Sequence, residues 1–297
     1  MLRTDIVKIL CHTRRHAYRL RLRYGKHTSA HILAGHCGFF GNMFMTLHGI
    51  RLCETANVRP HPLWGVESLF FERKYGPNVW DYYFVKIPVI NNSEASETRP
   101  QLTIKPDAMP IAPLYTGLNT RESYNRCIRK YVQIKEPIQK QINKVKDMFF
   151  MHQHVIGVHG RFTDAQAGFE NRQTAPVEKY FHVLDKYMAN NPVDRIFLAT
   201  DSLHALVKFK KRYGKYIIAL DCFRSKDNTS IHGHYDSGIA GSPYVKGLEV
   251  IQDAYLLSET SHLISVKSRV AKYSLCLNPH LTYTDVAKEQ HNNQNFN

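Results

Sequence analysis

The sequence predicts an α/β fold in which a parallel sheet is covered by helices on both faces. Three observations support it: short apolar runs in the C-terminal half, amphipathic segments between them, and polar residues directly after the runs. Strands that are apolar throughout and alternate with helices are typical of a buried parallel sheet. The chain has 297 residues, which is enough for two domains of about 150 residues each.

The C-terminal half contains the regular alternation. Apolar residues of the segments between the runs fall at helical spacing, for example Val177, Tyr180, Val183 and Leu184. The expected order is strand 154–160, helix 177–188, strand 195–200, helix 201–213, strand 216–220, helix 244–258, strand 262–266 and a helix that begins at Ser268. We therefore expect repeated βα units in this half.

The N-terminal half is less regular. Residues 30–35 are expected to form a strand and residues 42–56 a helix, whereas residues 91–113 are rich in Ser, Thr, Asn and Pro and are expected to form a surface loop. Pro137 can begin a further helix, because the first turn does not need its N–H. A boundary after that helix gives domains of residues 1–152 and 153–297.

The net charge of +15 indicates contact with something anionic, such as a nucleotide, nucleic acid or a lipid surface. The first 26 residues carry eight Lys and Arg side chains and a single acidic one, Asp5. That segment could lie on an acidic membrane, and a solvated basic helix or arm is an alternative that is favoured at least as much.

The cysteines are scattered and show no zinc-binding spacing, so we interpret them as free thiols. No apolar run reaches the roughly 18 residues that a membrane span needs, and the N-terminus lacks a signal-peptide core. We expect a soluble, cytoplasmic protein.

Polar residues follow three of the expected C-terminal strands. His159, Arg161 and Asp164 lie at the end of the first, Thr200 and Asp201 at the end of the second, and Lys267 and Ser268 after the last. In open α/β sheets ligands bind beyond these carboxyl ends. An arginine can grip a phosphate through paired hydrogen bonds, and a helix N-terminus at Ser268 offers free N–H groups. The alternatives are simpler structural roles. Arg161 could form an ion pair with Asp164, Thr200 and Ser268 could only cap helices, and His159 could be a core histidine.

A glycine-rich segment, residues 35–42, lies between the expected N-terminal strand and helix. Glycines such as Gly41 would let backbone approach a diphosphate closely. The spacing matches neither a dinucleotide-binding motif nor a P-loop, and an ordinary turn is the alternative.

Three motifs in order, VIGVHGRFTD, FLATDS and GLEVIQDAYLLSETSHLISVKS, resemble the fucosyltransferase superfamily. The nearest in motif are α1,6-fucosyltransferases of the nodulation and N-glycan-core type, and GFFGNM is similar to a segment of protein O-fucosyltransferases. The resemblance implies a GT-B fold of two Rossmann-like domains facing across a cleft. It also implies inverting transfer from GDP-fucose without a metal or other cofactor. The absence of a D-x-D triplet fits this, because metal-dependent transferases commonly hold the cation with such carboxylates.

The resemblance also implies roles for single residues. Arg161 matches the arginine that binds the β-phosphate and would neutralise the departing GDP. His159 matches the histidine beside guanine, and Asp253 matches the carboxylate that accepts from the guanine N1–H and amino group. The helix around Asp253 is largely apolar, where an unpaired carboxylate is costly, although an exposed aspartate is the alternative. The remaining donor-binding positions are Thr200, Asp201, Lys267 and Ser268, with Gly41 and Asn42 from the other domain.

The resemblance also implies a general base, and at one position this chain departs from the motif. Glu170 fills the place of a glutamate in the core-type enzymes if a short insertion is allowed, and Asp164 competes with it. Many members of the superfamily carry the motif HxRR, with a second arginine directly after the one that Arg161 matches. This chain has Phe162 at that position, which leaves one arginine for phosphate binding.

Three readings stay open beside the fucosyltransferase one. They are a transferase of the same fold that uses another GDP- or NDP-sugar, a degenerate relative that binds without turnover, and a nucleic-acid or anionic-surface binding protein. No known nucleic-acid motif is present, so nucleic acid is not the expected partner. The expected partners are the nucleotide-sugar donor and a glycan, lipid-linked or protein hydroxyl acceptor.

Overall fold

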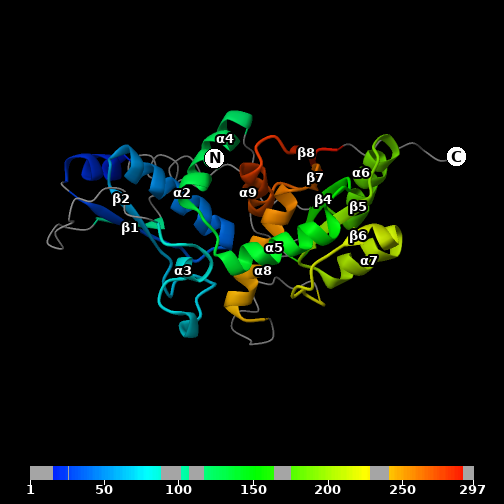
Figure 1. The fold of residues 1–297 in the computed structure, drawn as a ribbon, viewed down its shortest axis with the longest axis horizontal. Coiled ribbons are helices and arrows are strands. Elements are labelled where there is room, and N and C mark those ends of the chain that lie inside the picture. Colours follow the sequence, from blue (N-terminus) through cyan, green and yellow to red (C-terminus); the bar gives the residue numbers. More distant parts are fainter. Residues whose placement is uncertain are drawn as a thin grey trace, which may run out of the picture. The chain divides into compact units, whose positions relative to one another are not determined.

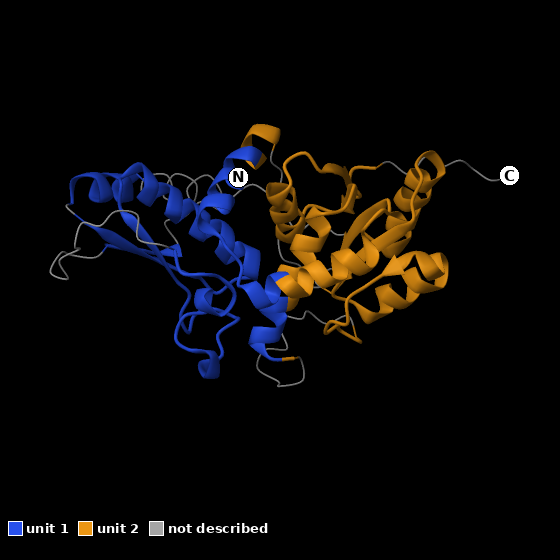
Figure 2. Ribbon diagram, in the orientation of Figure 1, with its two compact units in different colours: residues 1–113, 122–139, 242–248 blue, residues 114–121, 140–241, 249–297 orange. Residues whose placement is uncertain are grey.

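The computed structural model describes residues 16–25, 27–87, 102–106, 117–163, 175–227 and 241–289 (Figure 1). The chain forms two compact units (Figure 2). Unit 1 is made of Met1–Pro113, Glu122–Gln139 and Ser242–Leu248, and unit 2 of Leu114–Arg121, Lys140–Gly241 and Glu249–Asn297. The α/β prediction is confirmed, since each unit has a parallel sheet. The functional division into an acceptor-side domain 1–152 and a donor domain 153–297 stays a prediction.

Unit 1 contains a three-stranded sheet in the order β2-β1-β3. Its strands are β1 Ser29–Leu33, β2 Arg59–Leu63 and β3 Leu102–Ile104, and helix α2 Phe39–Thr55 connects β1 to β2. The expectation of a loop over residues 91–113 is wrong for β3. Leu102 and Ile104 are buried and flank an exposed Thr103, which is the alternation of a strand with one covered face.

The core of unit 1 is aromatic. Phe39 makes edge-to-face contacts with Trp64, Phe70 and Tyr83, and the Trp64 Nε1–H donates to Thr46 Oγ1 at 2.9 Å. These rings are buried. Much of the aromatic content that could suggest stacking on nucleic-acid bases therefore belongs to the core. The short elements η1 Arg73–Tyr75 and α3 Trp80–Tyr83 lie in the same segment of chain.

Unit 2 contains a five-stranded parallel sheet in the order β6-β5-β4-β7-β8 (Figure 1). The strands are β4 Val155–Gly160, β5 Arg195–Thr200, β6 Ile217–Ile218, β7 His262–Ser265 and β8 Thr282–Asp285. The first four confirm expected strands, with β6 shorter than expected. β8 was not expected from the sequence, and it is the outermost strand beside β7.

Helices on both faces bury this sheet, which explains why all six residues of β4 are buried. α6 Val177–Asn190 and α7 Leu203–Tyr213 share one core with Ile156, Val158 and Leu198. α8 Pro243–Ser258 packs close to β4: a Cβ at Gly157 would lie 3.0 Å from Leu257 Cδ2. α9 Arg269–Leu277 follows β7.

Three helices contribute residues to both units. They are α4 Leu118–Tyr131, α5 Glu136–Phe149 and α8. Residues 16–24 are also helical. Within the described ranges, no helix combines the length and apolar character required to cross a bilayer.

Candidate functional site

The carboxyl ends of three strands of unit 2 lie side by side. β4 is the central one, and it pairs with β5 so that Gly160 lies opposite Thr200, and with β7 so that His159 lies opposite Ser265. The segments that leave these strands therefore begin at one edge of the sheet, as the sequence predicted. Arg161, Asp201 and Lys267 stand in those three segments.

His159 and Ser268 are in direct contact at this edge. The His159 Nδ1 atom lies 3.2 Å from Ser265 Oγ and 3.2 Å from Ser268 Oγ, and the Tyr180 hydroxyl donates to the His159 carbonyl. Burial, with a smaller effect of the Arg161 charge, lowers the pKa of His159 to about 3. The imidazole is therefore neutral at physiological pH. The ring can form one hydrogen bond with a ligand but adds no positive charge.

Asp201 holds the segment that carries Arg161. Its Oδ1 accepts from the Phe162 N–H at 2.9 Å, and its Oδ2 accepts from Thr163 Oγ1 at 2.6 Å. Both carboxylate oxygens thus serve the segment 161–163. The role implied by the resemblance, lining the nucleotide, stays a prediction, whereas these contacts give Asp201 a positioning role. Thr200 is buried, and its Oγ1 accepts from the Ser202 N–H at 3.4 Å.

Phe162 has a packing role of its own. Its ring lies over Gly160, where a Cβ would come within 2.5 Å of Phe162 Cε2, and it makes an edge-to-face contact with Tyr180. Phe162, at the position of the second motif arginine, is therefore partly buried and packs against the core. Asp164 and Glu170, the two candidate bases, lie outside the described residues.

Ser268 is the N-cap of α9, and its Oγ accepts from the Ala271 N–H at 3.0 Å. The cap satisfies one of the first N–H groups of the helix, whose N-terminus follows directly after β7. Lys267 Nζ lies 3.9 Å from Asp285 Oδ2, so an acidic side chain faces the lysine that we expected to contact phosphate.

Asp253 lies in the part of α8 that belongs to unit 2. Burial raises the pKa of its carboxyl to about 7; Arg224 opposes this rise and Glu249 adds to it. The positive charge of Arg224 thus offsets part of the cost of placing the Asp253 carboxylate on an apolar helix. Sequence reasoning missed Arg224 and Glu249. The signals were a polar loop directly after β6 and a second carboxylate four residues before Asp253.

Gly41 and Asn42 lie in unit 1, in the first turn of α2. The helix begins three residues earlier than expected, so Gly41 is helical as well as Asn42. Asn42 is fully buried, and its Oδ1 accepts from the Gly35 N–H at 2.8 Å and from Cys37 Sγ at 3.1 Å. Its side chain thus holds the turn between β1 and α2. The expected contact with diphosphate stays a prediction.

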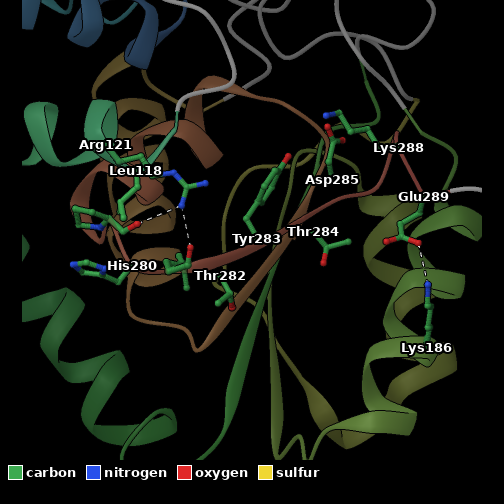
Figure 3. Close-up of a pocket in the computed structure, with 12 residues that line it drawn as sticks. Leu118, Arg121, Lys186, His280, Thr282, Tyr283, Thr284, Asp285, Lys288 and Glu289 are labelled. Carbon is green, nitrogen blue, oxygen red and sulfur yellow. Dashed lines mark hydrogen bonds and ion pairs between the residues drawn. The ribbon is translucent and has the colours of Figure 1, made fainter.

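A groove of about 1040 Å³ runs beside the outer strand β8 of unit 2 (Figure 3). Arg121 projects into it and donates to the carbonyls of Pro279 and Leu281 at 3.3 and 3.2 Å. Tyr283 and the Lys186–Glu289 ion pair also line it. The groove contains none of the residues predicted for the donor site.

Comparisons with known proteins identify the family and the fold. The family model for alpha-(1,6)-fucosyltransferase N- and catalytic domains matches residues 124–279. A search among curated proteins found no significant match.

Three solved structures illustrate the similarity in fold. NodZ alpha-1,6-fucosyltransferase soaked with GDP-fucose is 15% identical, with 84% of this chain and 93% of that chain covered and a TM-score of 0.57. Selenomethionine NodZ from Bradyrhizobium is 16% identical, with 89% and 97% covered and a TM-score of 0.58. A mutant of Arabidopsis thaliana FUT1 in complex with GDP is 9% identical, with 89% and 72% covered and a TM-score of 0.50.

These structures share the GT-B fold, which confirms the fold class expected for this chain. The family match covers more than half of the 297 residues and includes the segments of His159, Asp201, Asp253 and Ser268. The chain therefore belongs to the alpha-(1,6)-fucosyltransferase family and is a glycosyltransferase.

Proposed function

We propose that the chain is an inverting, metal-independent fucosyltransferase that uses GDP-fucose and a hydroxyl acceptor on a glycan, a lipid-linked sugar or a protein. The observation that carries the proposal is the arrangement at the carboxyl ends of β4 and β7, where the Arg161 segment, His159 and the N-terminus of α9 meet. The NodZ structure soaked with GDP-fucose has the same fold and supports this donor.

In this proposal Arg161 and the α9 N-terminus replace a metal ion. As the acceptor oxygen forms its bond to the anomeric carbon, the bond from that carbon to the β-phosphate oxygen breaks, and negative charge grows on GDP. A guanidinium and free backbone N–H groups stabilise that charge without reorganising. Attack from the face opposite to GDP inverts the configuration. Glu170 or Asp164 would take the proton of the acceptor hydroxyl.

The guanine base would bind to Asp253. An ionised carboxylate accepts two hydrogen bonds, and guanine offers two adjacent donors, N1–H and the 2-amino group. His159 would lie beside the base as a neutral ring, which its lowered pKa supports. Thr200 and Lys267 complete the unit 2 part of the donor site in the proposal, and a contact of Gly41 and Asn42 with the diphosphate stays a prediction.

The experiment compares fucose transfer by the wild type and by Arg161→Ala. The assay offers GDP-fucose, GDP-mannose and UDP-sugars with a panel of acceptors, with and without EDTA. We expect transfer from GDP-fucose that EDTA does not reduce and that Arg161→Ala abolishes. The control is Arg212→Ala, because Arg212 on α7 is exposed and pairs with Asp185 on α6. A strict need for Mg²⁺ or Mn²⁺, or full turnover by Arg161→Ala, would contradict the proposal. Transfer from GDP-mannose but not from GDP-fucose would identify a different GDP-sugar as the donor.

We further propose a cytoplasmic protein in peripheral contact with acidic membranes. Arg19, Arg21 and Arg23 are exposed on the helix of residues 16–24, together with Leu20 and Tyr24. Basic side chains interspersed with apolar ones suit the surface of an anionic bilayer. The test is co-sedimentation with phosphatidylserine vesicles, with Arg19→Glu/Arg23→Glu as the variant. Equal sedimentation with phosphatidylcholine vesicles would count against it.

A further inference from the structure

The segment of residues 220–225 leaves β6 at the same edge of the unit 2 sheet and is fixed at its far end. The Ser225 N–H donates to the Asp201 carbonyl at 2.8 Å, and the Leu203 N–H donates to the Ser225 carbonyl at 2.9 Å. Asp201 in turn holds residues 162 and 163 through its carboxylate. The backbone and side chain of Asp201 therefore join this segment to the one that carries Arg161.

Arg224 closes the segment on itself. Its Nη2 donates to the Leu220 carbonyl at 2.7 Å and its Nη1 donates to the Cys222 carbonyl at 3.1 Å. These carbonyl groups accept from the two terminal guanidinium nitrogens, whereas the buried Nε has no hydrogen-bond partner among the described residues, and carbonyl groups do not neutralise the charge. The positive charge of Arg224 is thus held in place and can act on acidic side chains nearby.

Two carboxylates of α8 face this segment. Glu249 Oε1 accepts from the Phe223 N–H at 3.1 Å. Asp253 is four residues further along α8, on the same face of the helix. Glu249 therefore fastens the segment to the helix face that presents Asp253.

The charges around Asp253 oppose one another. Arg224 stabilises its ionised form, whereas burial and the neighbouring Glu249 favour the protonated form, and together they leave its pKa at about 7. Asp253, Glu249 and Asp221 also act on the Cys222 thiol, whose pKa burial raises. Arg224, Glu249 and the Cys222 thiol are thus titratable groups that interact electrostatically with Asp253.

The ionisation of Asp253 decides what the carboxyl can bind. The ionised group accepts two hydrogen bonds, whereas the protonated group presents one donor of its own. A protonated Asp253 would set that donor against the two donors of guanine. Recognition of guanine therefore requires the charged form, which Arg224 favours.

We propose that Arg224 is a positioning residue for the nucleobase: it fastens residues 220–225 beside α8 and supplies the positive charge that keeps Asp253 able to accept from guanine. The inference rests on the proposed function, in which Asp253 binds the base. Arg224 contacts its own loop and acts through Asp253.

The test measures the dissociation constants of GDP and UDP by calorimetry between pH 5.5 and 8.5. UDP has the same diphosphate, so the ratio of the two constants removes the titration of the phosphate. For a carboxyl with a pKa of about 7, the preference of the wild type for GDP falls by roughly tenfold from the upper end of this range to pH 6. If Arg224→Met makes Asp253 a tenfold weaker acid, the preference drops about fivefold at pH 7 and nearly recovers at pH 8.5.

Two further variants separate charge from structure. Arg224→Lys keeps the charge but loses the paired bonds to Leu220 and Cys222, so its pH profile should have the wild-type midpoint with weaker binding. Asp253→Asn should remove the pH dependence of the preference. Arg212→Met is the control for the loss of an arginine in the same unit, and thermal melting verifies that each variant folds.

The outcomes separate the inference from the proposed function. A wild type without preference for GDP at any pH would overturn the proposed function. A wild type with the expected profile, and a folded Arg224→Met with the same profile, would overturn the inference alone. An Arg224→Lys midpoint that moves with that of Arg224→Met would show that the charge is not the agent.

Discussion

Asp201 offers a sharp test of how the strand ends are organised. Its carboxylate accepts from the Phe162 N–H at 2.9 Å and from the Thr163 hydroxyl at 2.6 Å. A hydrogen bond to a charged group contributes roughly 1.5–3 kcal/mol. The Thr163→Val variant removes one of these bonds and leaves Asp201 in place. Because 1.4 kcal/mol is about a factor of ten, we expect kcat/KM for GDP-fucose to fall by about tenfold or more.

The Asp201→Ala variant removes both bonds and should cost more than Thr163→Val. The double variant should cost no more than Asp201→Ala alone, because the Thr163 bond has already lost its acceptor. Steady-state kinetics on the four proteins give the coupling directly. Thr163→Ser, which keeps the hydroxyl, is the matched control.

Two results would refute this reasoning. Additive losses in the double variant would mean that Asp201 and Thr163 act separately, with Asp201 contacting the nucleotide itself. Unchanged kcat/KM in Thr163→Val would mean that the segment keeps Arg161 in place without this bond.

Three other predictions concern stability. His262 is buried between the hydroxyls of Thr282 and Thr284, and its pKa is lowered to about 4 from the ordinary 6.5. The contribution of this neutral ring to the free energy of unfolding is therefore fully present above pH 6.5 and is lost as the pH falls toward 4. Urea unfolding at pH 7.5 and pH 5 should therefore differ by about 2 kcal/mol from this residue, and His262→Gln should reduce the difference. Gly157→Ala should cost about 1–3 kcal/mol, because its Cβ would lie 2.8 Å from Thr260 Oγ1, whereas Gly65→Ala, with open space around it, should cost little by the same measurement. Asn42→Ala should cost about 1–3 kcal/mol by leaving the Gly35 N–H without its acceptor, and wild-type stability in this variant would show that the turn does not depend on the amide.

The strands at the centre of unit 2 could be predicted because their local signal is strong. β5 has the expected bounds, and β4 starts one residue later than expected, since runs such as RIFLAT are apolar on both faces. β8 and β3 were missed because both are short outer strands with polar residues. β3 pairs with β1, which lies 72 residues earlier in the chain, whereas β8 pairs with β7, which lies 20 residues earlier. Such pairing is decided by tertiary contacts that local propensity does not report.

The site was predictable where it follows strand ends and unpredictable where it depends on side-chain partners. His159 and Ser268 were expected to lie together, and a 3.2 Å contact joins them. Two features depend on the positions of other residues and could not be predicted. Both carboxylate oxygens of Asp201 accept hydrogen bonds from residues 162 and 163, and the Asn42 side chain is buried and accepts from the Gly35 N–H. Arg224 lies in an irregular loop whose sequence has no periodic pattern.

The most direct test of the central claim is a crystal structure of the protein with GDP. We expect the diphosphate between Arg161 and the first turn of α9, with the guanine edge on Asp253 and His159 beside the base. GDP bound in the groove along β8, or elsewhere away from the ends of β4, β5 and β7, would contradict it.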